Sequence, residues 1–186
     1  MHTTSLEEPK KVDRKFRLFT LYGDFAAGIR AKRLAGQIAR LTGIGWQHCL
    51  EMWKLDSIGA IVPIREMIAR EAAEADVLLI AVTSRDQPEP GVIRWLDSLS
   101  ALQANRSVPG LLVGLLGEHE QPPAVEPEFE RFDFVRELQQ YARRSGMDFV
   151  WRPIDRDGTD DCDWLAGNFR RLIARKESVP NTAIVQ

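Results

Sequence analysis

Two short polar segments of the sequence combine residue types that bind anions. The first begins at Gly23 and ends at Gly28, which is the glycine spacing of a phosphate-binding P-loop. Ile29 and Arg30 replace the lysine and the hydroxyl residue of that motif, so a nucleoside triphosphatase is not expected. Backbone amides where a helix begins can still bind an anion, with Asp24 and Arg30 nearby. The alternative is a tight turn with Arg30 in solvent.

The second polar segment, residues 83–91, follows the unbroken apolar run Val77 to Val82. In an open α/β sheet, ligands bind outside the carboxyl ends of the strands, and this segment follows such an end. Its hydroxyl and charged side chains suit an anionic group. The candidate ligand-binding residues are Thr83, Ser84, Arg85 and Asp86.

His119 is a further candidate, because it follows another apolar strand in an acidic, proline-rich surface loop. A histidine there suits proton transfer or metal binding. No second histidine stands at ligand spacing, so a solvated loop histidine is the favoured interpretation. The acidic cluster from Asp155 to Asp163 lacks the glycine position of a calcium loop, and no metal site is predicted.

Strand and helix patterns alternate along the chain and would position these residues. Strands are predicted at residues 16–22, 46–55, 77–82, 111–116 and 147–151, the last ending before Pro153. Helical spacing of apolar residues follows each strand. Phe134 is expected to pack in the core, and the alternative is a place off the buried stripe, where it would cover a partner surface. The expected buried positions are Leu34, Ile38, Leu41, Ile64, Met67, Ile68, Ala72, Val92, Trp95, Leu96, Leu99, Leu102, Phe132, Val135, Leu138, Ala142, Trp164, Leu165, Phe169, Leu172 and Ile173.

This alternation predicts an α/β protein, a three-layer doubly wound five-stranded parallel sheet with strand order 2-1-3-4-5. The second strand has the partial alternation of an edge strand. In this order the first and third strands are neighbours, so the two polar segments would face each other. Residues 16–176 would form one domain between flexible segments at residues 1–15 and 177–186.

Composition and charge indicate what kind of protein this is and which partners are not expected. The chain has 186 residues, 44% hydrophobic and 28% charged, as is usual for a globular protein, and its formal net charge of -2 does not favour nucleic acid. No apolar run is long enough to span a membrane and no secretory signal is recognised, so a cytoplasmic location is expected. Cys49 and Cys162 are expected to be free, buried thiols.

A stretch around the central strand resembles the NADPH-dependent FMN reductases and their flavodoxin-like relatives. The residues that carry the resemblance are Ala75, Asp76, Val77 to Val82, Pro90, Gly91, Val92, Trp95, Leu96 and Asp97. The resemblance implies a flavodoxin-like fold. In that family, aromatic and glycine residues flank the flavin ring and hydroxyl residues bind the FMN phosphate. Residues 83–87 contain neither an aromatic residue nor a glycine. Residues 24–27 (Asp-Phe-Ala-Ala) contain no hydroxyl residue.

Residues 152–155, Arg-Pro-Ile-Asp, resemble the Lys-Pro-Phe-Asp of bacterial response-regulator receivers. A receiver also needs a phospho-accepting aspartate at the end of its third strand and an acidic pair after its first. Here the third strand ends at Thr83, and Asp24 is alone after the first. This resemblance implies at most a receiver-like signalling module that is not phosphorylated.

The leading hypothesis is a flavodoxin-like binding or regulatory module with a degenerate flavin site, which binds a small anionic ligand and no cofactor. The alternative is an FMN-dependent NAD(P)H oxidoreductase with Tyr22, Arg85 and Trp53 or Trp95 beside the flavin ring. Analogy with flavodoxin-like proteins predicts a homodimer.

Overall fold

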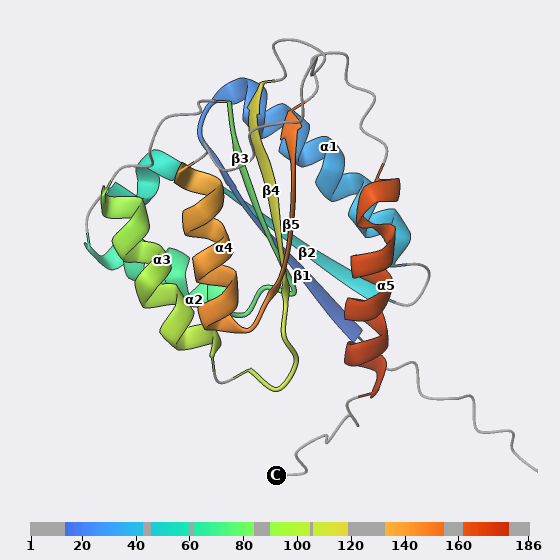
Figure 1. Cartoon of the computed structure of the whole chain (residues 1–186). Helices are drawn as coiled ribbons and strands as arrows, with labels where there is room; N and C mark the ends of the chain where they lie inside the picture. Colours follow the sequence, from blue (N-terminus) through green and yellow to red (C-terminus); the bar gives the residue numbers. More distant parts are fainter. Residues whose placement is uncertain are drawn as a thin grey trace, which may run out of the picture.

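A five-stranded parallel sheet forms the middle layer of the computed structural model (Figure 1). The structure describes residues 14–42, 46–59, 62–83, 90–104, 106–118, 133–154 and 162–178. Its strands are β1 (Arg14–Tyr22), β2 (Trp46–Lys54), β3 (Val77–Val82), β4 (Leu111–Glu118) and β5 (Asp148–Ile154), in the order β2-β1-β3-β4-β5. The predicted fold class, strand order and edge position of β2 are therefore confirmed.

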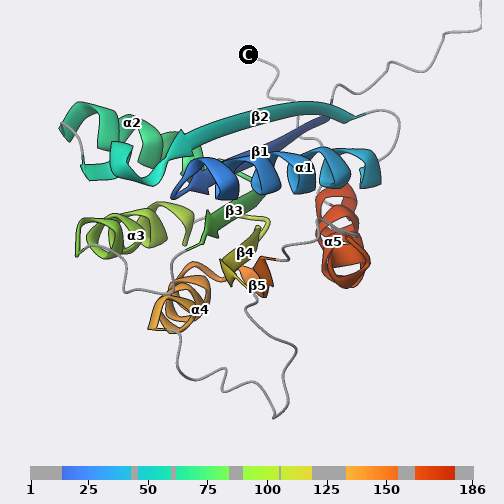
Figure 2. The same ribbon diagram turned by 90° about the horizontal axis from the view of Figure 1, so that it is seen from above.

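Helices cover both faces of the sheet, as Figure 2 shows. One face carries α1 and α5, and the other carries α2, α3 and α4. Their bounds are α1 (Phe25–Leu41), α2 (Val62–Ala73), α3 (Pro90–Gln103), α4 (Asp133–Ser145) and α5 (Asp163–Ser178), with a short 3-10 helix, η1 (Leu55–Gly59), before α2. None of the helices described is long and apolar enough to cross a membrane.

Alternate side chains of β3 belong to two separate hydrophobic cores, one on each face of the sheet. Val77, Leu79 and Ala81 pack with α1 and α5, while Leu78 and Ile80 pack with the other three helices. Every residue of β3 is buried, which explains why its sequence is continuously apolar rather than alternating. Cys49 and Cys162 are free thiols, but they are half-buried rather than fully buried.

Some predicted buried positions are wrong, because periodicity alone does not fix how a helix is rotated on the sheet. Leu41, Met67 and Leu102 are exposed. In α3 the next residue, Gln103, is buried instead, and its amide nitrogen donates to the carbonyl of Ala72 at 3.1 Å. Phe134 is buried, which agrees with its predicted packing in the core.

Two element boundaries also differ from the predictions. β5 continues through Pro153, which a strand at the sheet edge tolerates because its missing amide need not pair with a neighbour. α1 begins at Phe25, so Gly28 lies inside a helix and residues 23–28 are not a loop. The predicted loop over residues 118–128 lies almost wholly outside the described residues, as do Phe132 and the flexible terminal segments apart from Arg14, Lys15, Glu177 and Ser178.

Asp76 fixes the start of three strands. Its backbone amide donates to the carbonyl of Arg17 at 2.8 Å, and its carboxylate accepts from the amide of Arg17 at 2.9 Å. Its own carbonyl accepts from the amide of Leu111 at 2.9 Å. One buried residue therefore joins the amino ends of β1, β3 and β4.

Gly28 is a helix residue whose missing side chain makes room for an aromatic ring. A Cβ atom at this position would lie 2.9 Å from Cδ2 and 3.3 Å from Cγ of Tyr22, which is closer than side chains tolerate. Gly36, two turns later in α1, has no atom within 4 Å of its Cβ position. The two glycines differ in packing but share one helix.

This difference predicts opposite effects of the same substitution. Gly36→Ala should raise the melting temperature by about 2–4 °C, because alanine stabilises a helix interior by about 1 kcal/mol relative to glycine. Gly28→Ala should lower it, because the new methyl group displaces the Tyr22 ring. Thermal unfolding followed by circular dichroism measures both, and an equal rise in the two variants would contradict the packing described here.

Candidate functional site

The carboxyl ends of β1 and β3 bring three of the predicted site residues together. Gly23 and Asp24 follow β1, and Thr83 follows β3, its neighbour in the sheet. The Gly23 amide donates to the carbonyl of Ala81 at 2.9 Å, which continues the pairing of the two strands to their ends. The predicted meeting of the two polar segments at this edge is seen for these residues.

Of the other predicted site residues, the structure describes only Gly28 and Arg30, both in α1. Gly28 lies in the first turns of α1 beneath Tyr22. Arg30 is half-buried in the same helix, and its buried Nη1 has no hydrogen-bond partner among the described residues. Ser84, Arg85, Asp86 and His119 lie outside the described residues.

Asp24 caps the amino end of α1. Its backbone is extended (φ -136°, ψ 176°), and its Oδ1 accepts a hydrogen bond from the amide of Ala27 at 2.9 Å. Its Oδ2 accepts from the hydroxyl of Thr83. One carboxylate therefore satisfies an amide that the helix leaves unpaired and bridges the ends of β1 and β3.

The Asp24 carboxylate is stabilised in its charged form. Burial opposes ionisation, but the hydrogen bonds from the Thr83 hydroxyl and from the amides of Ala27, Ala26 and Thr83 outweigh it, so the pKa of Asp24 is below its ordinary value. The positive end of the α1 dipole favours the same charge. This edge of the sheet thus already carries a fixed anion that belongs to the chain.

A phosphate group of FMN does not fit the described residues here. In folds of this strand order, FMN binds at the switch point between β1 and β3, where a helix amino end offers amides to an anion. In this chain Asp24 accepts from those amides, and its negative charge faces the same place. Ala26 and Ala27 supply no side-chain donor.

The aromatic residues predicted to flank a flavin ring are not grouped at this edge. Trp95 is only 2% exposed, inside the core formed with α2, α3 and α4. Trp53 packs against that core, whereas Tyr22 packs against the core on the opposite face of the sheet. These three side chains therefore do not form one ring-binding surface.

In the receiver-like motif at residues 152–155, Arg152 packs against α5. The Arg152 guanidinium lies 5.6 Å from the centre of the Trp164 ring, a cation–π contact between β5 and α5. Asp155 lies outside the described residues. Nothing in the described part of the chain groups three residues that would hold a metal ion.

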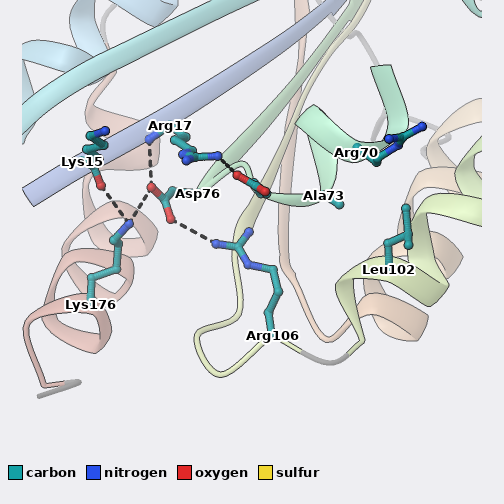
Figure 3. Close-up of a pocket in the computed structure, with 9 residues that line it drawn as sticks. Lys15, Arg17, Arg70, Ala73, Asp76, Leu102, Arg106 and Lys176 are labelled. Carbon is teal, nitrogen blue, oxygen red and sulfur yellow. Dashed lines mark hydrogen bonds and ion pairs between the residues drawn. The ribbon is translucent and has the colours of Figure 1, made fainter. Parts of the chain in front are cut away.

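A second polar site, which the sequence patterns did not reveal, lies at the opposite, amino edge of the sheet (Figure 3). It is a pocket of about 520 Å³ centred near Asp76. Its cations come from β1, α2, α5 and the segment that follows α3, so only the folded chain brings them together. The lining residues are Lys15, Arg17, Arg70, Ala73, Glu74, Asp76, Leu102, Arg106 and Lys176.

The parallel order β2-β1-β3-β4-β5 with helices on both faces decides the fold class. The fold is flavodoxin-like. No protein family model matches this flavodoxin-like chain, and no curated protein sequence matches it.

Solved structures resemble the flavodoxin-like chain at low sequence identity. A flavodoxin-like domain from Synechococcus sp. is 15% identical, with a TM-score of 0.43 over 86% of this chain and 94% of that one. An NADPH-quinone reductase from P. pentosaceus is 10% identical, with a TM-score of 0.47 over 90% and 98%. An FMN-dependent NADH-azoreductase from Bacillus anthracis in complex with FMN is 10% identical, with a TM-score of 0.48 over 88% and 99%.

Removal of the Asp24 carboxylate should destabilise the fold. Asp24→Ala loses the cap of α1 and the bridge to Thr83, and the expected cost is about 1–2 kcal/mol, or a fall in melting temperature of about 2–8 °C. Asp24→Asn keeps an acceptor at the cap and should lose less.

The difference in melting temperature between the wild type and the Asp24 variants should become smaller at low pH. A carboxyl whose pKa is lowered on folding stabilises the protein above its ordinary pKa, and that stabilisation is lost as the pH falls through the lowered value. Melting temperatures of the wild type and Asp24→Asn should therefore converge on acidification. Equal melting temperatures of the wild type and Asp24→Ala at pH 7 would contradict the capping role.

Proposed function

We propose that this protein is a flavodoxin-like binding or regulatory module that works without FMN. The observation that supports this function is the Asp24 carboxylate at the amino end of α1, where it accepts from the Ala27 amide and from Thr83. A flavoenzyme of this fold that binds FMN at the switch point between β1 and β3 would need that place for the phosphate. The small anionic ligand and the homodimer expected from the sequence remain predictions.

Charge repulsion disfavours a phosphate beside Asp24. Two unit charges about 4 Å apart repel each other by about 1 kcal/mol in water and about 4 kcal/mol near a protein surface. A phosphate at this edge would meet that repulsion from Asp24, and it would have to break the hydrogen bonds that stabilise α1 and join β1 to β3. Binding of a phosphate here would therefore destabilise the fold.

The alternative function is an FMN-dependent NAD(P)H oxidoreductase that holds its flavin by other contacts. It differs from the proposed module in one measurable property, which is affinity for FMN. Flavin bound to the purified protein would give it a yellow colour, and free FMN would lose fluorescence on binding. The two functions are therefore separable without knowledge of a substrate.

We expect the wild-type protein to be purified colourless and to show no saturable binding of micromolar FMN by fluorescence titration. Asp24→Ser removes the charge and supplies a hydroxyl cap, so FMN should bind this variant at least about fivefold more tightly than the wild type. Asp97→Ser is the control, since it removes a carboxylate from the exposed surface of α3. Wild-type protein that binds FMN at micromolar concentration would overturn the proposed function.

A further inference from the structure

We propose that the pocket at the amino edge of the sheet binds a small organic polyanion, a compound with two or more phosphate or carboxylate groups. Its volume of about 520 Å³ falls within the range of small-molecule sites. The site is at the end of the sheet opposite to Asp24, so this inference does not rest on the proposed function.

Charge is the first reason for this assignment. Five cationic side chains line the pocket, against the two lining carboxylates Glu74 and Asp76 and the carboxylate of Glu66, which pairs with Arg70 from outside the lining. The whole chain, by contrast, has a formal net charge of -2. Positive charge is therefore concentrated here beyond what the chain's own carboxylates neutralise. An anion with several charges would complete the balance.

The second reason is that buried Asp76 holds two of the cations in place. Arg106 Nη2 lies 3.2 Å from Oδ1 of Asp76, and Lys176 Nζ lies 2.6 Å from Oδ2. The Asp76 side chain is 4% exposed, and those of Arg106 and Lys176 are 22% and 18% exposed. One carboxylate thus fixes two cations, and the group retains a positive charge that is partly shielded from water.

Further contacts limit the freedom of these cations. Lys176 Nζ donates to the carbonyl of Lys15 at 3.2 Å and lies 5.8 Å from the centre of the Phe16 ring. Arg106 also donates to the carbonyl of Ala75. Positions fixed in this way reduce the ordering cost that flexible lysine and arginine side chains normally impose on a bound anion.

The remaining walls supply exposed charge and an apolar surface (Figure 3). Arg17 is paired with Glu74, and Nη2 of Arg70 lies 3.8 Å from Oε2 of Glu66. The two arginine side chains are 44% and 75% exposed, so both can reach a ligand. Leu102, 49% exposed, and Ala73 give the pocket an apolar wall near Arg70. An organic framework that carries its anionic groups on one side matches this division.

Two further glutamates of the same edge line a neighbouring hollow rather than the pocket. A smaller hollow of about 120 Å³ shares Arg17, Arg70 and Glu74 with it, and its other ionisable residues include Glu51 and Glu71. Burial and the neighbouring Glu71 raise the pKa of Glu51. Neither Glu51 nor Glu71 lines the basic pocket itself.

The test is calorimetric titration of the full chain with inorganic pyrophosphate and, separately, with citrate, at constant ionic strength near 0.15 M. We expect saturable submillimolar binding of at least one of them. The double variant Lys15→Gln/Arg70→Gln should weaken binding at least about tenfold, because it removes two charge-assisted donors. These side chains lie at the surface, and circular dichroism confirms that the variant is folded.

The matched control is Lys32→Gln/Arg33→Gln, which makes the same change in net charge on the exposed face of α1 and should bind like the wild type. Pyrophosphate and citrate distinguish phosphate from carboxylate recognition. The proposal is overturned if neither anion binds, if both double variants bind alike, or if a fluorescent single-stranded oligonucleotide binds while the small anions do not. The result is independent of the FMN titration, because the two experiments probe opposite ends of the sheet.

Discussion

The pairing of β1 with β3 depends on two aspartates, one at each end. At the amino end, the Asp76 carboxylate accepts from the amide of Arg17 across the strand pair. At the carboxyl end, Asp24 accepts from the hydroxyl of Thr83. Between these ends the register runs from Leu18 opposite Val77 to Tyr22 opposite Ala81. A parallel sheet leaves unpaired groups where its strands end, and these two carboxylates satisfy them at the centre of the sheet.

The two aspartates have opposite consequences for ligands. Asp24 takes its hydrogen bonds from neutral donors, so its carboxylate keeps its negative charge at the amino end of α1. Asp76 takes an ion pair from each of two cations, Arg106 and Lys176, so its surroundings keep a net positive charge. The sheet therefore has a fixed carboxylate at the amino end of α1, where folds of this strand order bind phosphates, and a cluster of cations at the opposite edge. This polarity is why we place anion binding at the amino edge.

Sequence patterns predicted the fold well, because an apolar run such as Val77 to Val82 requires cover on both faces. They also predicted that Asp24 and Thr83 would meet, since neighbouring parallel strands end at the same edge. The start of α1 was missed because Gly28 suggested a loop, whereas its role is to accommodate the Tyr22 ring. The amino-edge pocket was beyond sequence reasoning, because Arg17, Asp76 and Lys176 meet only through the strand order and the path of α5.

Leu102 shows how an error in the predicted core bears on function. Helical spacing assigned it to the buried stripe of α3, yet Gln103 occupies the interior and bonds to Ala72 in α2 and to Tyr141 in α4. A buried amide with partners on two other helices fixes how α3 is rotated. That rotation turns Leu102 outward, against the basic pocket, where it adds apolar surface beside Arg70. The polar contact inside the core thus determines the shape and chemistry of the pocket wall.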